Sequence, residues 1–168
     1  ARRSMEKLIL DGRIHPARIE EIVEQTKAEL IDLIMETGKH TSYEVGIHNL
    51  SSLEIELLGK MKFYTVIGQN LLQHTIEVVH LTAMLAGELN LDVALAKRAA
   101  LLHDIGRVAD EGQEGNHAQV GADIAKRCKE PMEVINAIAA HHEEVPARSL
   151  YAILLQVAHS IAIERLGA

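Results

Sequence analysis

The sequence predicts an all-α fold. Apolar residues recur at helical spacing in nearly every stretch of the 168 residues, and no stretch shows the sustained alternation that is typical of half-buried strands. Proline, serine, aspartate or asparagine precedes several of these stretches, and glycine follows some of them, as expected at helix starts and stops. The chain is also long enough to bury a substantial core. We therefore expect a helical bundle with a helical extension.

The first two predicted helices follow from these start and stop signals. Pro16 is favoured in a first helical turn, and the long amphipathic pattern after it continues to Gly38, which predicts the helix end. Residues 39–49 mix turn formers with apolar residues and predict a loop or a short extended piece. The next helix is short, with Ser51 or the serine after it as its cap and Gly59 as its stop.

The later helices have their own start signals. Asp92 can cap a helix that stops at Gly106, Asn116 can cap the next, Pro131 starts another and Ser149 begins the last. In full, the predicted helices cover residues 16–37, 51–59, 69–89, 92–105, 116–128, 131–142 and 149–165.

Composition divides the chain into two parts. Residues 1–62 carry Glu, Lys and Arg on helical faces and predict an N-terminal helical extension, whereas residues 63–168 carry Ala-rich helices and predict the main domain. The apolar face of residues 16–37 is expected to pack on this main domain, with a homodimer seam as the alternative.

Charge and cysteine content exclude several classes of protein. A net charge of −7 argues against a broad nucleic-acid footprint, so a polyanion would have to be held locally. The single cysteine, Cys128, excludes a disulfide framework and favours a reducing, cytoplasmic compartment. No apolar run approaches the roughly 18 residues of a membrane span, so we expect no direct membrane contact. The start "ARRSME" resembles neither a signal peptide nor a natural start, which suggests a part of a longer protein.

Histidine is over-represented, with ten residues, and several lie where helices are expected to end. His103 and Asp104 lie near the end of "RAALLHDIGR", and His141 and His142 close "VINAIAAHH". Adjacent residues of a helix point about 100° apart, so both members of such a pair can face one site only at a helix end. Imidazole and carboxylate are ligands of divalent first-row ions, and a buried carboxylate is costly unless it is paired.

This ordered set predicts a metal site. An aspartate that bridges two ions between two sets of histidines would form a dinuclear site, and two ions about 3.5–4 Å apart can activate a water and stabilise a leaving oxygen in phosphoryl transfer. Any one of these histidines taken alone is more often an ordinary core or surface residue. We assign four histidines to that ordinary class: His15, His40, His48 and His80.

The motifs also carry a resemblance. The segments "LLQHTIEVVHL", "RAALLHDIGR", "EGNHAQVGADIAKR" and "VINAIAAHH" resemble the successive motifs of the HD-domain metal-dependent phosphohydrolases of the HDIG subgroup. Together with "LILDGRIHPARIEE", the whole chain resembles the ribonuclease Y family in the region that follows its RNA-binding KH domain. The resemblance implies an HD-domain helical bundle and an endoribonuclease that cuts single-stranded RNA in messenger RNA decay. It further implies other mRNA-decay proteins as partners, and a parent protein anchored to the inner face of the cell membrane by a segment outside this chain.

The resemblance also implies roles for individual residues. Asp104 would bridge the two ions, and His103 and Asp104 would act with a bridging water as the nucleophile while both ions polarise the phosphate. The ligands that it implies are His74, His103, Asp104, His117, His141 and His142.

Three positions depart from the family pattern. His159 lies where the family has its last aspartate ligand, and an added imidazole favours manganese, iron or zinc over magnesium, or costs the site one ion. Arg107 replaces the family lysine and is expected to bind the substrate phosphate. Glu143 replaces a glycine and adds a negative charge near the phosphate.

Two other functions therefore remain open. The acidic balance suits a compact substrate, as in a cyclic-nucleotide or dinucleotide phosphodiesterase. His159 in place of an aspartate suits a degenerate, non-catalytic HD scaffold that binds one metal or nucleotide and serves oligomerisation.

Overall fold

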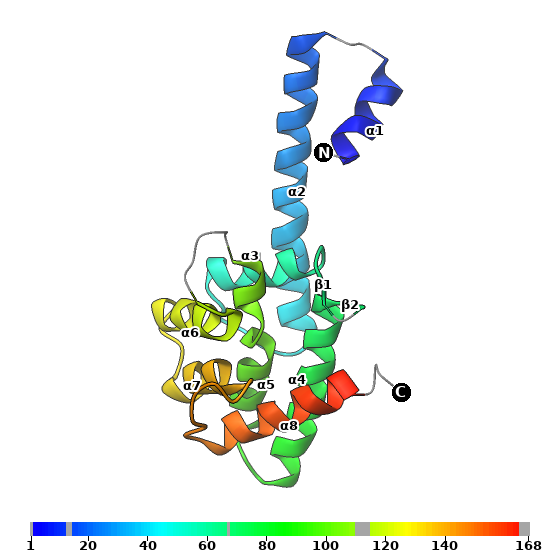
Figure 1. The fold of residues 1–168 in the computed structure, drawn as a ribbon. Helices are drawn as coiled ribbons and strands as arrows, with labels where there is room; N and C mark the ends of the chain where they lie inside the picture. Colours follow the sequence, from blue (N-terminus) through cyan, green and yellow to red (C-terminus); the bar gives the residue numbers. More distant parts are fainter. Residues whose placement is uncertain (1, 13–14, 67, 110–114, 165–168) are drawn as a thin grey trace.

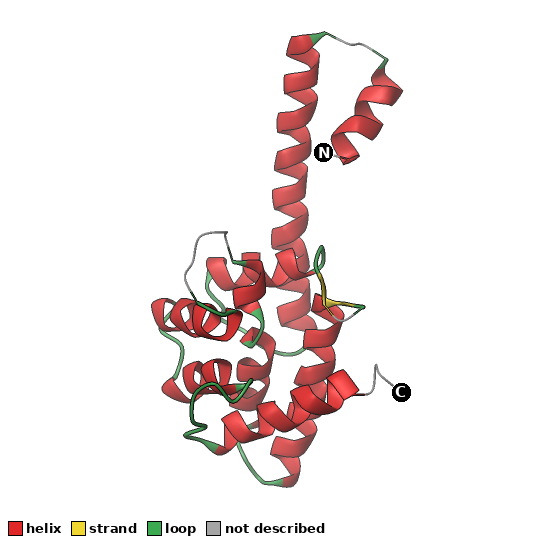
Figure 2. Cartoon of the chain, viewed as in Figure 1, coloured by secondary structure: helices red, strands yellow, loops and turns green. Residues whose placement is uncertain are grey.

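The fold is helical, as predicted. The structure is a computed structural model that describes residues 2–12, 15–66, 68–109 and 115–164. Within these residues it contains eight α-helices, one 3-10 helix and a two-stranded hairpin of two residues per strand, so helices dominate the whole described chain (Figure 2). The elements are α1 Arg2–Asp11, α2 Pro16–Glu44, α3 Ser52–Met61, β1 Thr65–Val66, β2 Gln69–Asn70, α4 Leu71–Glu88, α5 Val93–Leu102, η1 Ile105–Val108, α6 His117–Arg127, α7 Met132–Ala140 and α8 Leu150–Glu164.

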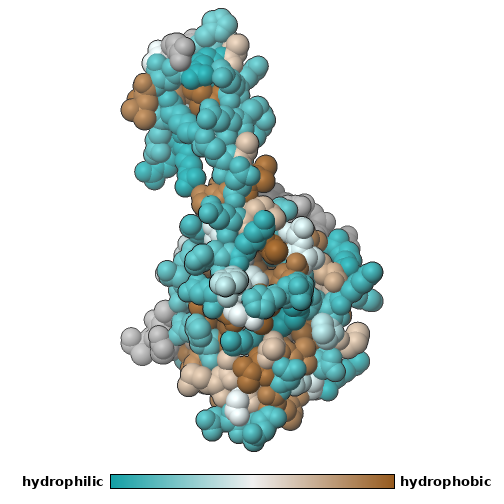
Figure 3. All heavy atoms as spheres, turned by 180° about the vertical axis from the view of Figure 1, so that it is seen from behind, coloured by the Kyte–Doolittle hydropathy of each residue, from teal (hydrophilic) through white to brown (hydrophobic). Residues whose placement is uncertain are grey.

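The long helix α2 joins two parts of the molecule. Its N-terminal half projects from the bundle with α1 lying beside it, and its C-terminal half packs on α3 (Figure 1). An ion pair of 2.6 Å between Lys7 Nζ and Glu29 Oε2 links α1 to α2. Seen from behind, this projecting part is mostly hydrophilic, and hydrophobic side chains are more frequent on the bundle (Figure 3).

The core lies between α3, α4, α5, α6, α7 and α8. Leu58 of α3, Leu71 of α4, Leu101 of α5, Ile138 of α7 and Leu155 of α8 are fully buried and belong to one hydrophobic cluster. The cluster thus contains side chains from both sides of residue 62, so α3 packs into the same core as the later helices.

Several predicted caps are confirmed. The Ser51 hydroxyl accepts a hydrogen bond from the Glu54 amide. The Asp92 carboxylate accepts one from the Ala94 amide, and the Asn116 side-chain oxygen accepts one from the Gln119 amide. These contacts satisfy amides that the first helical turn leaves without partners. Local polar residues therefore determine the starts of α3, α5 and α6.

The predicted helix ends at glycines were wrong. Helix α2 continues through Gly38 to Glu44, so residues 39–44 of the predicted loop are helical, whereas residues 45–49 form a turn and loop as predicted. A Cβ on Gly38 would lie 1.9 Å from the Ile55 carbonyl oxygen, and one on Gly59 would lie 1.9 Å from that of Ile34. These two glycines lie inside α2 and α3 and allow the backbones of the two helices to approach each other.

Gly106 has a similar role. Helix α5 ends at Leu102, four residues before it, and Gly106 belongs to η1. A Cβ there would lie 2.0 Å from the His117 carbonyl oxygen, so the missing side chain allows η1 to contact the start of α6. The paired strands β1 and β2 were not predicted, and the predicted end of the last helix at residue 165 lies outside the described residues. None of the described helices is both long and apolar enough to cross a lipid bilayer.

Candidate metal centre

All the side chains predicted as metal ligands come together in the bundle. They form two adjoining groups, which we call the histidine–aspartate cluster. The contributing residues are His74 of α4, His103 and Asp104 after α5, His117 of α6, His141 and His142 after α7, and His159 of α8. The four histidines assigned to the ordinary class, His15, His40, His48 and His80, are all exposed.

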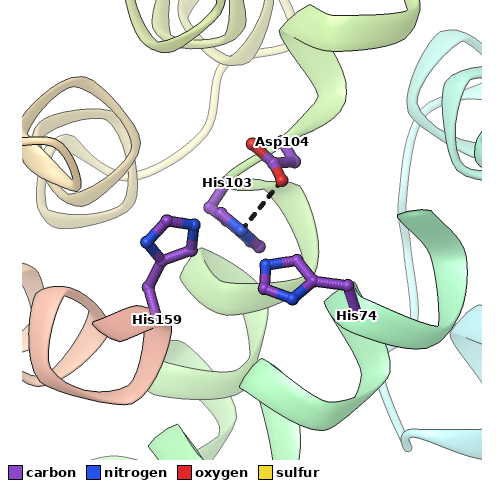
Figure 4. Close-up of side chains that lie close together, drawn as sticks. All are labelled: His74, His103, Asp104 and His159. Carbon is purple, nitrogen blue, oxygen red and sulfur yellow. Dashed lines mark ion pairs between the residues drawn. The ribbon is translucent and has the colours of Figure 1, made fainter. Parts of the chain in front are cut away.

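The first group is enclosed by the bundle. It consists of His74, His103, Asp104 and His159, whose ligand atoms lie within 4.8 Å of one another (Figure 4). All four residues are buried, with at most 5% of their surface exposed. The rings of His159 and His74 lie 5.3 Å apart between centroids, so His159 takes its place in the group together with the predicted ligands.

The second group lies closer to the surface. It consists of His117, His141 and His142, and the Nε2 atom of His117 lies 3.3 Å from that of His141 and 2.9 Å from that of His142. His141 is buried, whereas the side chain of His117 is 21% exposed and His142 is partly exposed. A ligand from solvent would therefore reach this group first.

Asp104 lies between the two groups. Its Oδ2 atom lies 3.3 Å from His103 Nε2 in the first group. Its Oδ1 atom lies 3.5 Å from His117 Nε2 and 3.7 Å from His141 Nε2 in the second. Each carboxylate oxygen thus faces a different group, which is the arrangement that a bridging carboxylate requires.

Two backbone carbonyls orient the histidine rings. His103 Nδ1 lies 2.7 Å from the Ala100 carbonyl oxygen, and His141 Nδ1 lies 2.6 Å from that of Ile138. Because a carbonyl only accepts, each Nδ1 must donate, and the Nε2 atom of the neutral ring then carries a lone pair toward the cluster. These two hydrogen bonds were not predicted from the sequence. They could have been expected, because the last carbonyls of a helix lack partners and each histidine lies just after a helix, three residues after the carbonyl that it contacts.

Burial favours the neutral form of the imidazoles. It lowers the pKa of His74, His117 and His142 to about 4, and the pKa of His159 to about 2. The charge of the Arg107 guanidinium adds to the effect of burial on the pKa of His117. Neutral imidazole is the form that binds a metal ion.

Asp104 remains ionised despite its burial. Burial alone would raise its pKa, but the neighbouring His103 and Arg107 outweigh burial and hold the pKa well below its usual range. The cluster therefore combines six imidazoles with one ionised carboxylate, which is a donor set for divalent transition metals.

Two atoms of the first group fit a metal ion for a further reason. Neither His103 Nε2 nor Asp104 Oδ2 has a hydrogen-bond partner among the described residues, although both are buried. With His103 neutral and its Nδ1 donating to the Ala100 carbonyl, the lone pairs of His103 Nε2 and Asp104 Oδ2 face each other across 3.3 Å, which is unfavourable unless a cation lies between them. These unpaired donor atoms provide a place for a divalent metal ion.

Arg107 contacts the cluster directly. Its Nε atom donates to Asp104 Oδ1 over 2.7 Å, and its Nη2 atom lies 3.4 Å from His142 Nε2. The guanidinium therefore lies on the same side as the partly exposed second group. Glu143, next along the chain from His142, has a φ of 63°, a left-handed conformation that favours glycine.

Comparison with known proteins gives consistent matches. Residues 71–163 match the family model described as HD domain. Over its full 168 residues the chain is 54% identical to a ribonuclease Y of Acetivibrio thermocellus, 51% to one of Lachnoclostridium phytofermentans and 52% to one of Clostridium tetani. These alignments cover 32–33% of each relative, so the chain spans about a third of the length of the curated relatives it matches. No solved structure was found to match the chain.

Proposed function

Because the chain belongs to the HD domain family, we propose that it is a metal-dependent phosphodiesterase that cleaves single-stranded RNA endonucleolytically in messenger RNA decay. The observation that carries this proposal is the convergence of two groups of three imidazoles on either side of Asp104, whose oxygens lie 3.3–3.7 Å from His103, His117 and His141. The relatives named ribonuclease Y support RNA as the substrate.

The donor set supports two divalent ions. One would be held by His74, His103, Asp104 and His159, and the other by Asp104 with the second group of histidines. Six nitrogen donors and one carboxylate favour manganese, iron or zinc over magnesium, which prefers oxygen ligands. When bound, such ions supply Lewis-acid activation of a water and of the phosphate.

The residues of the chain have separate tasks in this proposal. Ala100 and Ile138 hold the rings of His103 and His141 through their carbonyl oxygens, so that the Nε2 atoms are oriented before a ligand arrives. Asp104 aligns the two groups. Arg107 is 24% exposed at the open side and would donate two hydrogen bonds to a phosphate oxygen pair.

Partners and location follow the same relatives. We propose single-stranded RNA as the binding partner, held locally because the net charge is −7, and other mRNA-decay proteins as further partners. We also propose that the chain forms a homodimer. The parent protein would be anchored to the membrane, with the residues of this chain in the cytoplasm. Helix α2 provides the surface for the dimer prediction, because its projecting half contacts only α1 among the described helices in Figure 1.

The decisive experiment is cleavage of an end-labelled, 5′-monophosphorylated single-stranded RNA with manganese. We expect Asp104→Asn to lower the rate by at least about 100-fold, because losing a ligand costs more than the 10- to 100-fold typical of an outer-shell partner. His80→Gln is the matched control, since His80 is exposed on α4 and its loss should leave the rate unchanged. Circular dichroism would show that both variants remain folded.

The same assay separates the rival functions. Faster hydrolysis of a cyclic dinucleotide than of RNA would favour the small-substrate phosphodiesterase. The non-catalytic scaffold is suggested by His159, which is 4% exposed and lies in the first group. If wild type is inactive and His159→Asp gains hydrolysis, the scaffold is the better description; if His159→Asp loses hydrolysis, His159 is a working ligand.

A further inference from the structure

The two oxygens of Asp104 are not equivalent. Oδ2 faces His103 and has no hydrogen-bond partner among the described residues. Oδ1 faces His117 and His141 but already accepts a hydrogen bond of 2.7 Å from Arg107 Nε. The chain thus places its own cation on the oxygen that an ion in the second group would share.

The second group is also the less favourable of the two for a cation by charge. Imidazole ligands are neutral when they bind a metal, so Asp104 is the one anionic ligand that the second group can share among the described residues. Arg107 Nη2 lies 3.4 Å from His142 Nε2, which brings the guanidinium charge to the edge of that group. A second divalent ion would therefore meet both a competitor for its carboxylate and a like charge.

The Arg107 guanidinium is partly exposed to solvent, so it has an alternative to its contact with Asp104. The Arg107 side chain is 24% exposed, whereas the Asp104 side chain is 1% exposed. Arg107 can therefore turn toward solvent or toward a bound phosphate, while Asp104 stays in place. A contact between a partly exposed side chain and a fully buried one can open on the exposed side, so an incoming ion can replace Arg107 at Asp104.

We propose that Arg107 controls the entry of the second ion: one ion binds tightly in the first group, and another enters the second group only when Arg107 releases Asp104. This inference rests on the proposed function, because it requires the histidine–aspartate cluster to bind metal. It assigns Arg107 a role in metal loading in addition to its contact with phosphate.

The test is a manganese titration of chelator-stripped protein, followed by the electron paramagnetic resonance signal of free manganese. We expect wild type to show one tight site and one at least tenfold weaker. Arg107→Gln, which removes the charge, should tighten the weaker site at least tenfold and change the tight site less than threefold. Arg107→Lys, which keeps a charge, should leave the second site weak.

Two further variants locate the sites. His117→Ala should abolish the weaker site alone, and His74→Ala should weaken the tight one. Two equally tight sites in wild type, or a second site that Arg107→Gln leaves unchanged, would overturn the role of Arg107 while leaving the metal centre intact. Absence of manganese binding in folded wild type and every variant would overturn both the metal centre and the role of Arg107.

Discussion

Among the described residues, two buried polar clusters differ in how completely an arginine pairs the carboxylate that it contacts: Arg107 pairs only Oδ1 of Asp104, whereas Arg98 pairs both oxygens of Glu130. In the histidine–aspartate cluster, His103 Nε2 and Asp104 Oδ2 face each other without a hydrogen-bond partner in the described part of the chain. In the other, which we call the carboxylate–arginine cluster and which consists of Glu54, Arg98 and Glu130, Arg98 donates to both oxygens of Glu130.

The carboxylate–arginine cluster joins three segments of the chain. Arg98 of α5 also donates to the carbonyl oxygens of His48 and Asn49, which precede α3. Glu54, in the first turn of α3, is fully buried. Its Oε2 accepts a 2.7 Å hydrogen bond from the Ser51 amide, while its Oε1 has no hydrogen-bond partner among the described residues but no imidazole converges on it. These contacts tie α3, α5 and the turn after α6 together, so the cluster has a structural role.

The difference separates a ligand site from a structural network. Buried polar groups that find partners inside the chain stabilise one arrangement of its segments. Donor atoms that converge without partners leave room for a cation from outside. Changes in the carboxylate–arginine cluster should therefore alter stability, and changes in the histidine–aspartate cluster should alter metal binding.

The largest expected effect on stability is that of Arg98→Met. It leaves the carboxylate of Glu130, whose side chain is 3% exposed, without its cation. Breaking a buried pair in this way costs about 3–5 kcal/mol, and we expect about 3 kcal/mol because Arg98 itself is partly exposed. Urea denaturation of chelator-stripped protein measures this loss.

Two further variants sharpen this comparison. Arg98→Met combined with Glu130→Gln should recover part of the loss, because no uncompensated charge remains buried. Asp104→Asn should cost less stability than Arg98→Met, because Arg107 can turn to water. Equal losses for Asp104→Asn and Arg98→Met would mean that the two clusters do not differ as described.

A change of pH should have an intermediate effect on the stability of the metal-free protein. The pKa of His74 is lowered to about 4, against about 6.5 in an unfolded chain. Between these values the unfolded state binds more protons than the folded state, so stability falls as the pH falls from about 6.5 toward 4. Since several histidines of the cluster share this shift, stripped protein should lose at least about 2 kcal/mol between pH 7 and pH 5, roughly the linkage of one such group.

Thermal and urea unfolding at the two pH values check this prediction. His159→Gln removes one buried titrating group, whose pKa is lowered to about 2, and should flatten the profile. Equal stability of the stripped wild type at pH 5 and pH 7 would contradict the prediction.

The smallest effect, opposite in its pH dependence, is expected from Glu54→Gln. Burial raises the pKa of Glu54, and the nearby Glu130 adds to this effect against the lowering hydrogen bonds from Ser51. The protonated form thus stabilises the fold at low pH, and this contribution is lost as the pH rises through the raised pKa. Glutamine cannot ionise, so the stability of the variant relative to wild type should increase from pH 5 to pH 8.

Urea denaturation at both pH values measures this difference. The side-chain carbonyl of the substituted glutamine can still accept a hydrogen bond from the Ser51 amide, so the cap is retained. A variant whose stability relative to wild type falls from pH 5 to pH 8 would show that the charge of Glu54 stabilises the fold.

Local signals in the sequence were enough to predict the helical class and most helix starts. Asp92 and Asn116 cap α5 and α6 because their side chains reach amides only two or three residues away. Glycine was a poor guide to helix ends: Gly38 and Gly59 serve the contact between α2 and α3. Whether a glycine ends a helix or admits a neighbouring backbone depends on a segment distant in sequence.

The sequence by itself also determined which residue types are available for the site, because the paired His103–Asp104 and His141–His142 come directly after helices. Only the tertiary structure decided that His74 and His159 complete one group, that His117 joins the other, and that Arg107 holds one oxygen of Asp104. The physical reason is range: a cap or a helix end depends on neighbours along the chain, whereas these contacts depend on how α4, α5, α6, α7 and α8 pack around one core.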